Sequence, residues 1–330
     1  MTRAPGHHRC RARPQRGAAL LLAMLVVTLV ATLASAAVWQ QWRAAEVENA
    51  ERQRLQAGWI LTGALDWARL ILREDARGNQ TSGNADHLGE PWAMPLEEAR
   101  LSSFLAADRE NTADDVLEAF LSGEVIDMQS RLNFMNLVKV SGAGAAAKTE
   151  ISEPDMQAFT RLYKQLDLPQ AELTAAVDEL VTTLNLAASD PMPSRTALTP
   201  RKLAHLGWLG IGPGSLAALE PHVAVLPERT TLNINTASPQ AIVASVPGLD
   251  MAQAQRLVTE RDRNPFKTLA DASRLGPTGQ WSELQHGTRS RYFEVRGRLR
   301  LEDAVIEERS LVVRNNLDVR VSWRERIAGR

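Results

Sequence analysis

An uncharged apolar stretch from Ala18 to Trp39 is the strongest pattern in the sequence. As an α-helix it would be roughly 33 Å long, enough to cross a bilayer core. A buried core helix of this length would normally keep a polar face, which this stretch lacks. We therefore predict a membrane helix, and its membrane-facing leucines are Leu20, Leu22, Leu25, Leu29 and Leu33.

The charges before this stretch predict its orientation. Five arginines and no acidic residue precede it: Arg3, Arg9, Arg11, Arg13 and Arg16. Because positively charged flanks stay on the cytoplasmic side, the N-terminus is expected in the cytoplasm and the bulk of the protein across the membrane.

The helical pattern continues beyond the membrane, from Arg43 to Arg73, without a proline. Apolar residues recur there at spacings that place them on one helix face: Leu61, Leu65, Ala68 and Leu72. We predict one long helix whose second half packs on a globular body. Two separate helices are the alternative, since Gly58 and Gly63 could weaken or bend it.

The C-terminal end alternates with period two, which is typical of strands. From Phe293 to Leu301 the odd positions are apolar or small and the even ones are charged. Ala304 to Val313 and Leu317 to Trp323 predict two more strands, with Arg314 to Asn316 as the turn between them. Such a meander needs a cover on its apolar face, and the stripe of the long helix is the obvious candidate.

The middle of the sequence is mostly helical. From Ser152 to about Ala272 short helices are expected, with starts at Ser152, Thr199 and Ser238. The N-terminal and C-terminal parts then form one α+β domain, into which an all-α unit is inserted.

The patterns before this unit are less uniform. Residues 77–89 predict a loop, and residues 96–107 and 112–121 predict helices. Short strands are expected at 124–129 and 132–138. A linker of small residues follows them.

Charge and cysteine content narrow the candidate chemistry. The formal net charge is −1, and without the arginines of the first 17 residues, 33 basic residues face 39 acidic ones. Such a body does not favour a general nucleic-acid surface. The single cysteine is Cys10 and the histidines lie far apart, so neither a disulfide nor a zinc site is expected. No catalytic constellation can be assembled from the spacing, so we expect no enzyme.

Three fates are open for the N-terminal segment. The apolar helix could be a permanent anchor, or a secretory signal cut after the small-residue pattern at 34–36. The third fate is a cut after Gly17, which makes Ala18 the first residue and resembles the processing of type IV prepilins. Ordinary pilins carry Glu at the fifth mature position, where this sequence has Leu22. Without a carboxylate to pair with the neighbouring subunit, this protein suits the first subunit of a fibre.

Two internal segments make the resemblance more specific. One runs from Ile126 to Leu137, and the other joins Val225-Leu226-Pro227 to the segment from Thr231 to Ala237. With the leader, long helix, insertion and meander, they resemble the minor pseudopilin K family of type II secretion systems over nearly the whole sequence. The positions that match these segments, expected to be structural, are Asp127, Arg131, Asn133, Asn136, Asn233, Asn235 and Thr236.

The resemblance implies a pilin-like α+β fold, with a long N-terminal helix packed on an antiparallel meander and a large inserted all-α domain. The expected segments are a leader (1–17), a transmembrane half-helix (18–41), a periplasmic helix with the first strands (42–147), the inserted domain (148–284) and the C-terminal meander (285–330).

The resemblance also implies assembly rather than catalysis. A prepilin peptidase would cut after Gly17 and methylate the amine of Ala18. The mature protein would be a single-pass protein of the inner membrane, with its bulk in the periplasm and its place at the pseudopilus tip. The implied partners are minor pseudopilins I, J and H, the major pseudopilin G and the inner-membrane secretion platform.

No cofactor is predicted. Calcium is known in some members of this family, in which an Asp-rich stretch follows one helix. Here Asn185 to Pro191 replaces that stretch, so calcium binding is not carried over to this protein.

Residues 241–266 offer a rival function. The turn from Val246 to Asp250 resembles a helix–hairpin–helix, which binds the DNA backbone through two glycines. Here Asp250 takes the second glycine position, and its carboxylate would repel a phosphate, although Arg256 and Arg261 are nearby. We expect a structural hairpin and no nucleic acid; a membrane-anchored or periplasmic DNA-binding protein is the alternative.

Overall fold

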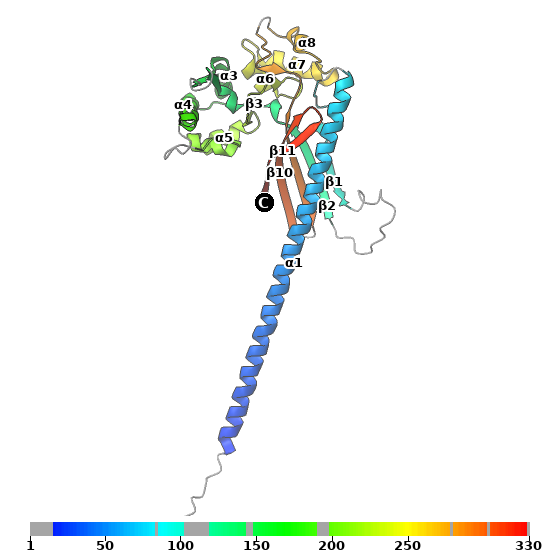
Figure 1. Cartoon of the computed structure of the whole chain (residues 1–330), viewed down its shortest axis with the longest axis vertical. Helices are drawn as coiled ribbons and strands as arrows, with labels where there is room; N and C mark the ends of the chain where they lie inside the picture. The colour runs from blue at the N-terminus through cyan, green and yellow to red at the C-terminus, as the bar shows by residue number, and fades with distance from the viewer. Residues whose placement is uncertain are drawn as a thin grey trace, which may run out of the picture. The chain divides into compact units, whose positions relative to one another are not determined.

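The computed structural model describes residues 16–82, 85–101, 119–142, 148–189, 198–277, 280–301 and 304–328. Contacts divide the protein into two units, the first ending at Gly58 and the second beginning at Trp59. The N-terminal helix α1, Arg16–Ser82, contributes to both (Figure 1). The prediction of one continuous helix through Gly58 and Gly63 is confirmed.

In the first unit, α1 exposes its apolar side chains. The hydroxyls of Thr28 and Thr32 donate to the carbonyls of Leu25 and Leu29, at 2.9 and 2.8 Å. Both hydroxyls are therefore satisfied within the helix, as a lipid environment requires. Among the described residues, α1 is the one helix long and apolar enough to cross a membrane.

A five-stranded antiparallel sheet forms the β part of the second unit, in the order β1-β2-β9-β10-β11. Its strands are β1 Leu96–Arg100, β2 Ala119–Asp127, β9 Tyr292–Leu301, β10 Ala304–Asn315 and β11 Asp318–Ala328. The predicted C-terminal meander of β9, β10 and β11 is confirmed. In its last turn Asn316 has a φ of 56°, a left-handed conformation that Asn tolerates.

Three local predictions around the start of this sheet are wrong. Residues 96–100 form β1 and pair with β2 instead of forming a helix, and residues 119–121 begin β2. Helix α1 continues through residues 77–82, where the sequence predicts a loop. Pairing with a neighbouring strand overrides local helix propensity at the first two places. Most of the remainder of the two predicted helices, 102–118, lies outside the described residues.

The second half of α1 covers one face of the sheet, beside β10 and β11 (Figure 1). The helix stripe shares one buried apolar cluster with the sheet: Leu65, Ala68, Leu72, Trp92, Phe293, Val295, Val312 and Val319. A Cβ at Gly297 would lie 3.2 Å from Leu61 Cδ2, which shows how closely helix and sheet approach. The predicted cover of the meander by the helix stripe is confirmed.

The insertion lies between β2 and β9 in the sequence. Its helices are α3 Glu153–Gln165, α4 Gln170–Ser189, α5 Pro213–Leu219, α6 Pro239–Ser245, α7 Met251–Arg263 and α8 Leu269–Ser273. Short strands pair within it: β3 Leu132–Asn133 with β6 Val223–Ala224, β4 Val138–Ser141 with β5 Lys148–Ile151, and β7 Leu232–Asn233 with β8 His286–Gly287. The 3₁₀ turns are η1 Pro91–Ala93, η2 Met128–Ser130, η3 Phe134–Leu137 and η5 Leu203–Leu209. The strand predicted at 132–138 is therefore interrupted by η3.

Two apolar clusters hold the insertion together and join it to the sheet. The larger one includes Phe134 and Phe159, whose rings meet edge-on at 5.7 Å. The smaller one joins Met128 to Leu311 of β10. Since neighbouring residues of a strand point to opposite faces, Leu311 lies on the face opposite Val312 and α1. The sheet is thus packed on both faces, and the predicted domain boundaries at 147 and 284 stay predictions.

Candidate functional site

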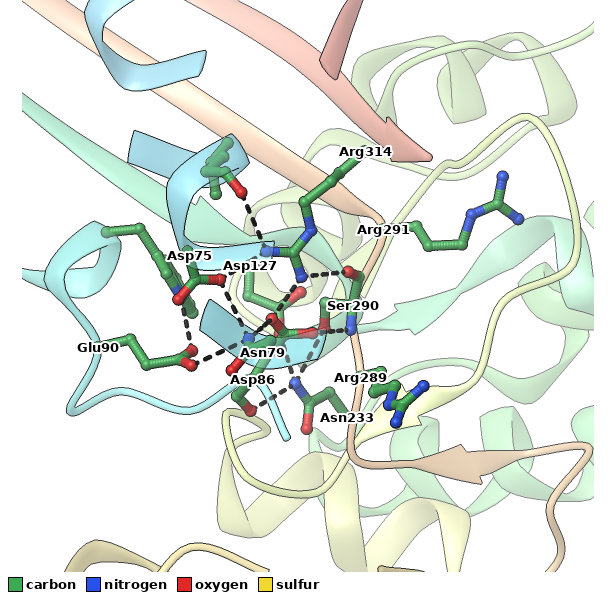
Figure 2. Close-up of polar contacts among 12 residues, drawn as sticks. Asp75, Asn79, Asp86, Glu90, Asp127, Asn233, Arg289, Ser290, Arg291 and Arg314 are labelled. Atoms are coloured by element: carbon green, nitrogen blue, oxygen red, sulfur yellow. Dashed lines mark hydrogen bonds and ion pairs between the residues drawn. The ribbon is translucent and has the colours of Figure 1, made fainter. Parts of the chain in front are cut away.

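The end of β2 is where three of the predicted family positions meet. Asp127 Oδ2 accepts hydrogen bonds from Ser290 Oγ at 2.6 Å and Asn233 Nδ2 at 3.0 Å (Figure 2). It also accepts from Thr236 Oγ1 at 2.5 Å. Asp127 Oδ1 accepts from the backbone N–H of Gln129 at 2.7 Å and so caps η2. One carboxylate therefore ties β2 to the insertion and to the segment that leads into β9.

Burial dominates the electrostatics of Asp127. Loss of hydration raises the pKa of its carboxyl to about 6, although hydrogen bonds from Ser290, Thr236 and Gln129 act in the opposite direction. The carboxylate is thus ionised near neutral pH and takes up its proton in mildly acidic solution.

Arg314 supplies a buried positive charge to two other carboxylates, those of Asp75 and Asp86. Its side chain is only 7% exposed and pairs through Nη1 with Asp75 Oδ2 at 2.6 Å and through Nη2 with Asp86 (Figure 2). Nη2 also donates to the Ser290 carbonyl at 2.9 Å, and the guanidinium lies 4.8 Å from the Phe293 ring centroid. Asp75 lies in α1, Asp86 follows α1 and Arg314 lies in β10, so one guanidinium joins three segments.

Asp86 connects the two sets of contacts. Its Oδ2 accepts from the backbone N–H of Ser290 at 2.6 Å, and its carbonyl accepts from Asn233 Nδ2 at 3.1 Å. These contacts make one buried network, the polar junction, formed by Asp75, Asp86, Asp127, Asn233, Thr236, Ser290 and Arg314.

Glu90 adds a third carboxylate beside Asp75 and Asp86. Oxygen atoms of the three lie within 4.8 Å of one another, a spacing that could hold a cation. Protein donors already serve all three, because Arg314 pairs with the two aspartates and Trp92 Nε1 donates to Glu90 at 2.7 Å. Burial raises the pKa of the Glu90 carboxyl. We assign no metal to this cluster.

Two predicted asparagines form a separate contact. Asn133 Oδ1 accepts from the backbone N–H of Leu226 at 3.0 Å, and its Nδ2 donates to the carbonyl of Glu228 at 2.8 Å. Asn136 bonds to both backbone groups of Thr230, at 2.7 and 3.1 Å. The Asn-rich segment thus joins η3 to residues 226–230 through hydrogen bonds between side chains and backbone.

The side chains of the remaining predicted positions do not join the junction, although the backbone N–H of Asn235 donates to Asn233 Oδ1 at 3.0 Å. Asn235 exchanges two hydrogen bonds with the backbone of Phe266, both at 2.9 Å. Arg131 joins neither network; it is half-buried in a cavity whose walls come from the insertion and from the sheet face opposite α1.

The rival segment 241–266 does form a helical hairpin, in which α6 and α7 flank Gly248 with a φ of 75°. Asp250 caps α7, since its Oδ1 accepts from the N–H of Gln253 at 2.7 Å and its own backbone N–H donates to Gln253 Oε1 at 3.0 Å. This carboxylate occupies the helix terminus that a phosphate would need. Arg261 is buried and donates to two backbone carbonyls at 2.6 Å. Asp250 and Arg261 therefore serve the fold.

The predicted processing site and membrane residues lie in the first unit. Gly17 and Ala18 fall within α1. The leucines expected to face lipid are between 55% and 66% exposed: Leu20, Leu22, Leu25, Leu29 and Leu33. Cleavage and methylation at Gly17 and Ala18 stay predictions.

Sequence reasoning missed four residues of the junction: Asp75, Asp86, Ser290 and Arg314. The alternation places Arg314 beside a turn, but it also puts this residue on the same strand face as Val312, where a charge needs a partner. A charged residue on an apolar strand face is the feature that could have indicated a buried ion pair at Arg314. Asp86 and Ser290 lie outside any periodic pattern, and no local feature indicates their burial.

Comparisons with known proteins find similarity to type II secretion system protein K. A model of the family "Type II secretion system (T2SS), protein K" matches residues 232–287, which include Asn233, Asn235 and Thr236. Type II secretion system protein K of Pseudomonas aeruginosa is 26% identical over 311 residues, covering 88% of this chain and 86% of that protein. The protein of the same name from Pectobacterium carotovorum subsp. carotovorum is 25% identical over 337 residues, covering 94% and 96%.

A solved structure shares the fold. It belongs to the GspK-GspI-GspJ complex from enterotoxigenic Escherichia coli, with a TM-score of 0.57 and 16% identity over 85% of this chain and 99% of that one. The chain shares with that structure a long apolar helix packed on an antiparallel sheet, with a helical insertion. Together with the curated relatives, this fold supports a minor pseudopilin, which is an assembly protein and not an enzyme. Over nearly its whole length, the protein is similar to type II secretion system protein K of these bacteria.

Replacing Arg314 by Met leaves Asp75 and Asp86 buried without their cation. The free energy of unfolding should fall by about 3–5 kcal/mol, the cost of removing one partner of a buried ion pair. The side chain of Arg320, in the next strand, is 75% exposed, so Arg320→Met should cost less than about 0.5 kcal/mol. Urea unfolding of the detergent-purified protein measures both. Equal losses in the two variants would contradict the assigned role of Arg314.

The raised pKa of Asp127 predicts a pH-dependent stability. Between the usual value of 3.8 and the folded value of about 6, the folded state holds the proton more tightly, so this contribution to stability is lost as the pH rises through 6. Asp127→Asn removes the titration. The wild type should exceed the variant in unfolding free energy by about 1–2 kcal/mol more at pH 5 than at pH 8. A difference that is larger at pH 8 would mean that the hydrogen bonds to Asp127 outweigh burial.

Proposed function

We propose that this minor pseudopilin forms the tip of a periplasmic pseudopilus and supports the export of folded proteins across the outer membrane. The observation that carries the proposal is the union of an apolar anchor helix, a pilin-like sheet and a bulky insertion in one protein. An insertion of this size would collide with its neighbours along a close-packed fibre, so the subunit belongs at an end. Leu22, in place of the usual Glu, fits a subunit without a neighbour on one side.

The proposed orientation rests on charge. The arginines before Ala18 hold the N-terminus in the cytoplasm, and residues 18–41 cross the inner membrane. A prepilin peptidase cuts after Gly17 and methylates the amine of Ala18. The second unit, with residues 148–284 as its inserted domain, then lies in the periplasm.

The outer face of α1 is the proposed surface for other pseudopilins. Trp59, Trp67 and Leu70 are 77%, 62% and 37% exposed, and they recur with Gly63 at helical spacing opposite the stripe that packs on the sheet. Aromatic side chains gathered on an exposed face are typical of protein interfaces. The solved relative is a complex of GspK with GspI and GspJ. By analogy, minor pseudopilins I and J bind this protein, with H, the major pseudopilin G and the inner-membrane platform as further partners.

Processing can be tested by the intact mass and N-terminal sequence of the protein recovered from membranes. We expect a polypeptide that begins at methylated Ala18, because a basic segment and Gly17 precede an unbroken apolar helix. A polypeptide that begins at Ala37 would indicate a secretory signal and a protein without an anchor. An uncut polypeptide that begins at Met1 would contradict the proposed cleavage.

Partner binding can be tested by capture of minor pseudopilins I and J on the detergent-purified protein. Combining Trp59→Ala and Trp67→Ala should weaken capture at least about tenfold, because buried tryptophans carry much of the energy of interfaces. Trp208, 49% exposed in η5, is a matched control, and Trp208→Ala should leave capture unchanged. Undiminished capture by the folded double variant would rule out this face.

A further inference from the structure

A cavity of about 360 Å³ lies away from the polar junction and from the outer face of α1. Its walls come from the insertion and from the face of the sheet opposite α1. The insertion contributes Leu203 and Leu216, while β10 and β11 contribute Leu311 and Trp323. Apolar walls and a volume in this range are typical of ligand sites.

Arg131 is a partly buried cation of this cavity whose guanidinium lacks an acceptor among the described residues; Arg309 Nε and Trp323 Nε1, in the same lining, also lack a partner there. Its side chain is half-buried, and its guanidinium donates no hydrogen bond to any residue that the structure describes. Burial lowers the pKa of Arg131, and the negative charge of Glu294 acts against this effect. The charge of Glu294 is shared with a second arginine, because its Oε1 already accepts a hydrogen bond from Arg296 Nε at 2.6 Å. A guanidinium with five donors and no acceptor is costly to bury.

Three of the other cations of the cavity are already paired, namely Lys202, Arg296 and Arg309, and the fourth, Arg201, is exposed. Lys202 and Arg309 both pair with Glu325, and Lys202 lies 4.7 Å from the Trp323 ring centroid. Among the lining residues that the structure describes, basic groups outnumber acidic ones: Arg131, Arg201, Lys202, Arg296 and Arg309 against Glu220, Glu294 and Glu325. The cavity lining therefore has a net positive charge, and Arg131 is the cation best placed to pair with a negatively charged ligand.

We propose that this cavity binds a polypeptide segment in which a carboxylate stands next to an apolar side chain. The carboxylate pairs with Arg131, whose planar fork suits bidentate contact, and the apolar side chain lies against Leu216, Leu311 and Trp323. A polypeptide is chosen over a small metabolite on the strength of the proposed function, since a tip subunit meets other proteins. The C-terminal carboxylate of a protein and an internal Asp or Glu present the same chemistry.

Binding of three short peptides distinguishes a C-terminal carboxylate from an internal Asp or Glu. They are acetyl-Leu-Leu with a free carboxylate, acetyl-Leu-Leu-amide, and acetyl-Leu-Asp-Leu-amide. Their dissociation constants can be measured by ligand-observed NMR on the full-length protein in detergent, at low and at high salt. We expect the neutral amide to bind at least about tenfold more weakly than one or both of the carboxylate peptides, because one charge-assisted contact is lost. High salt should weaken the binding of the two carboxylate peptides and leave the binding of the neutral amide unchanged.

Variants test the assigned residue. Arg131→Gln should weaken the carboxylate peptides at least about tenfold and leave the neutral amide unchanged. Arg256→Gln, an exposed arginine of α7 outside the cavity, should change nothing. If Arg131→Gln does not fold, Ala217→Phe serves instead: Ala217 is an exposed cavity residue of α5, and a ring there should block all binding.

Two results would overturn the proposal. One is equal affinity of the free carboxylate peptides and the neutral amide, and the other is no binding of any peptide. Neither result would affect the capture of minor pseudopilins I and J, which depends on the outer face of α1. The two proposals can therefore fail independently.

Discussion

A buried guanidinium among carboxylates is the interaction on which the arrangement of the second unit depends. Arg314 loses its hydration on folding, and only well-placed acceptors offset that cost. Asp75, Asp86 and the Ser290 carbonyl provide them. Since these acceptors come from α1, from the segment after it and from the entrance to β9, they must meet at one point. Asp86 is hydrogen-bonded to Asn233, and Ser290 is hydrogen-bonded to Asp127. Through these bonds the position of the insertion also depends on Arg314.

This constraint lets a single helix serve two purposes. One face of α1 is buried on the sheet through Leu65, Ala68 and Leu72. The other face displays Trp59 and Trp67. Because the buried face fixes the rotation of the helix about its own axis, the exposed tryptophans keep a defined direction relative to the sheet.

Periodic segments were predictable from the sequence, and isolated polar residues were not. The apolar stripe of α1 and the alternation in β9 follow from the spacing of side chains on helices and strands. Strand β1 could not be predicted, since Leu96–Arg100 has no alternation and becomes a strand by pairing with β2. Asp127 and Asn233 were found through a family resemblance. Asp86 and Arg314 escaped it because their burial arises from contacts between segments that are distant in the sequence.

The separation of these charges along the sequence has a consequence for folding. Arg314 lies 228 residues after Asp86 and 239 residues after Asp75. In the orientation proposed above, a polypeptide delivered across the membrane from its N-terminal anchor presents the carboxylates long before their cation arrives. The contacts of the polar junction are therefore among the most non-local in the molecule, and such contacts are slow to form. Until the last strands are delivered, the apolar stripe of α1 has no sheet to cover, and the incomplete protein exposes a surface prone to wrong association.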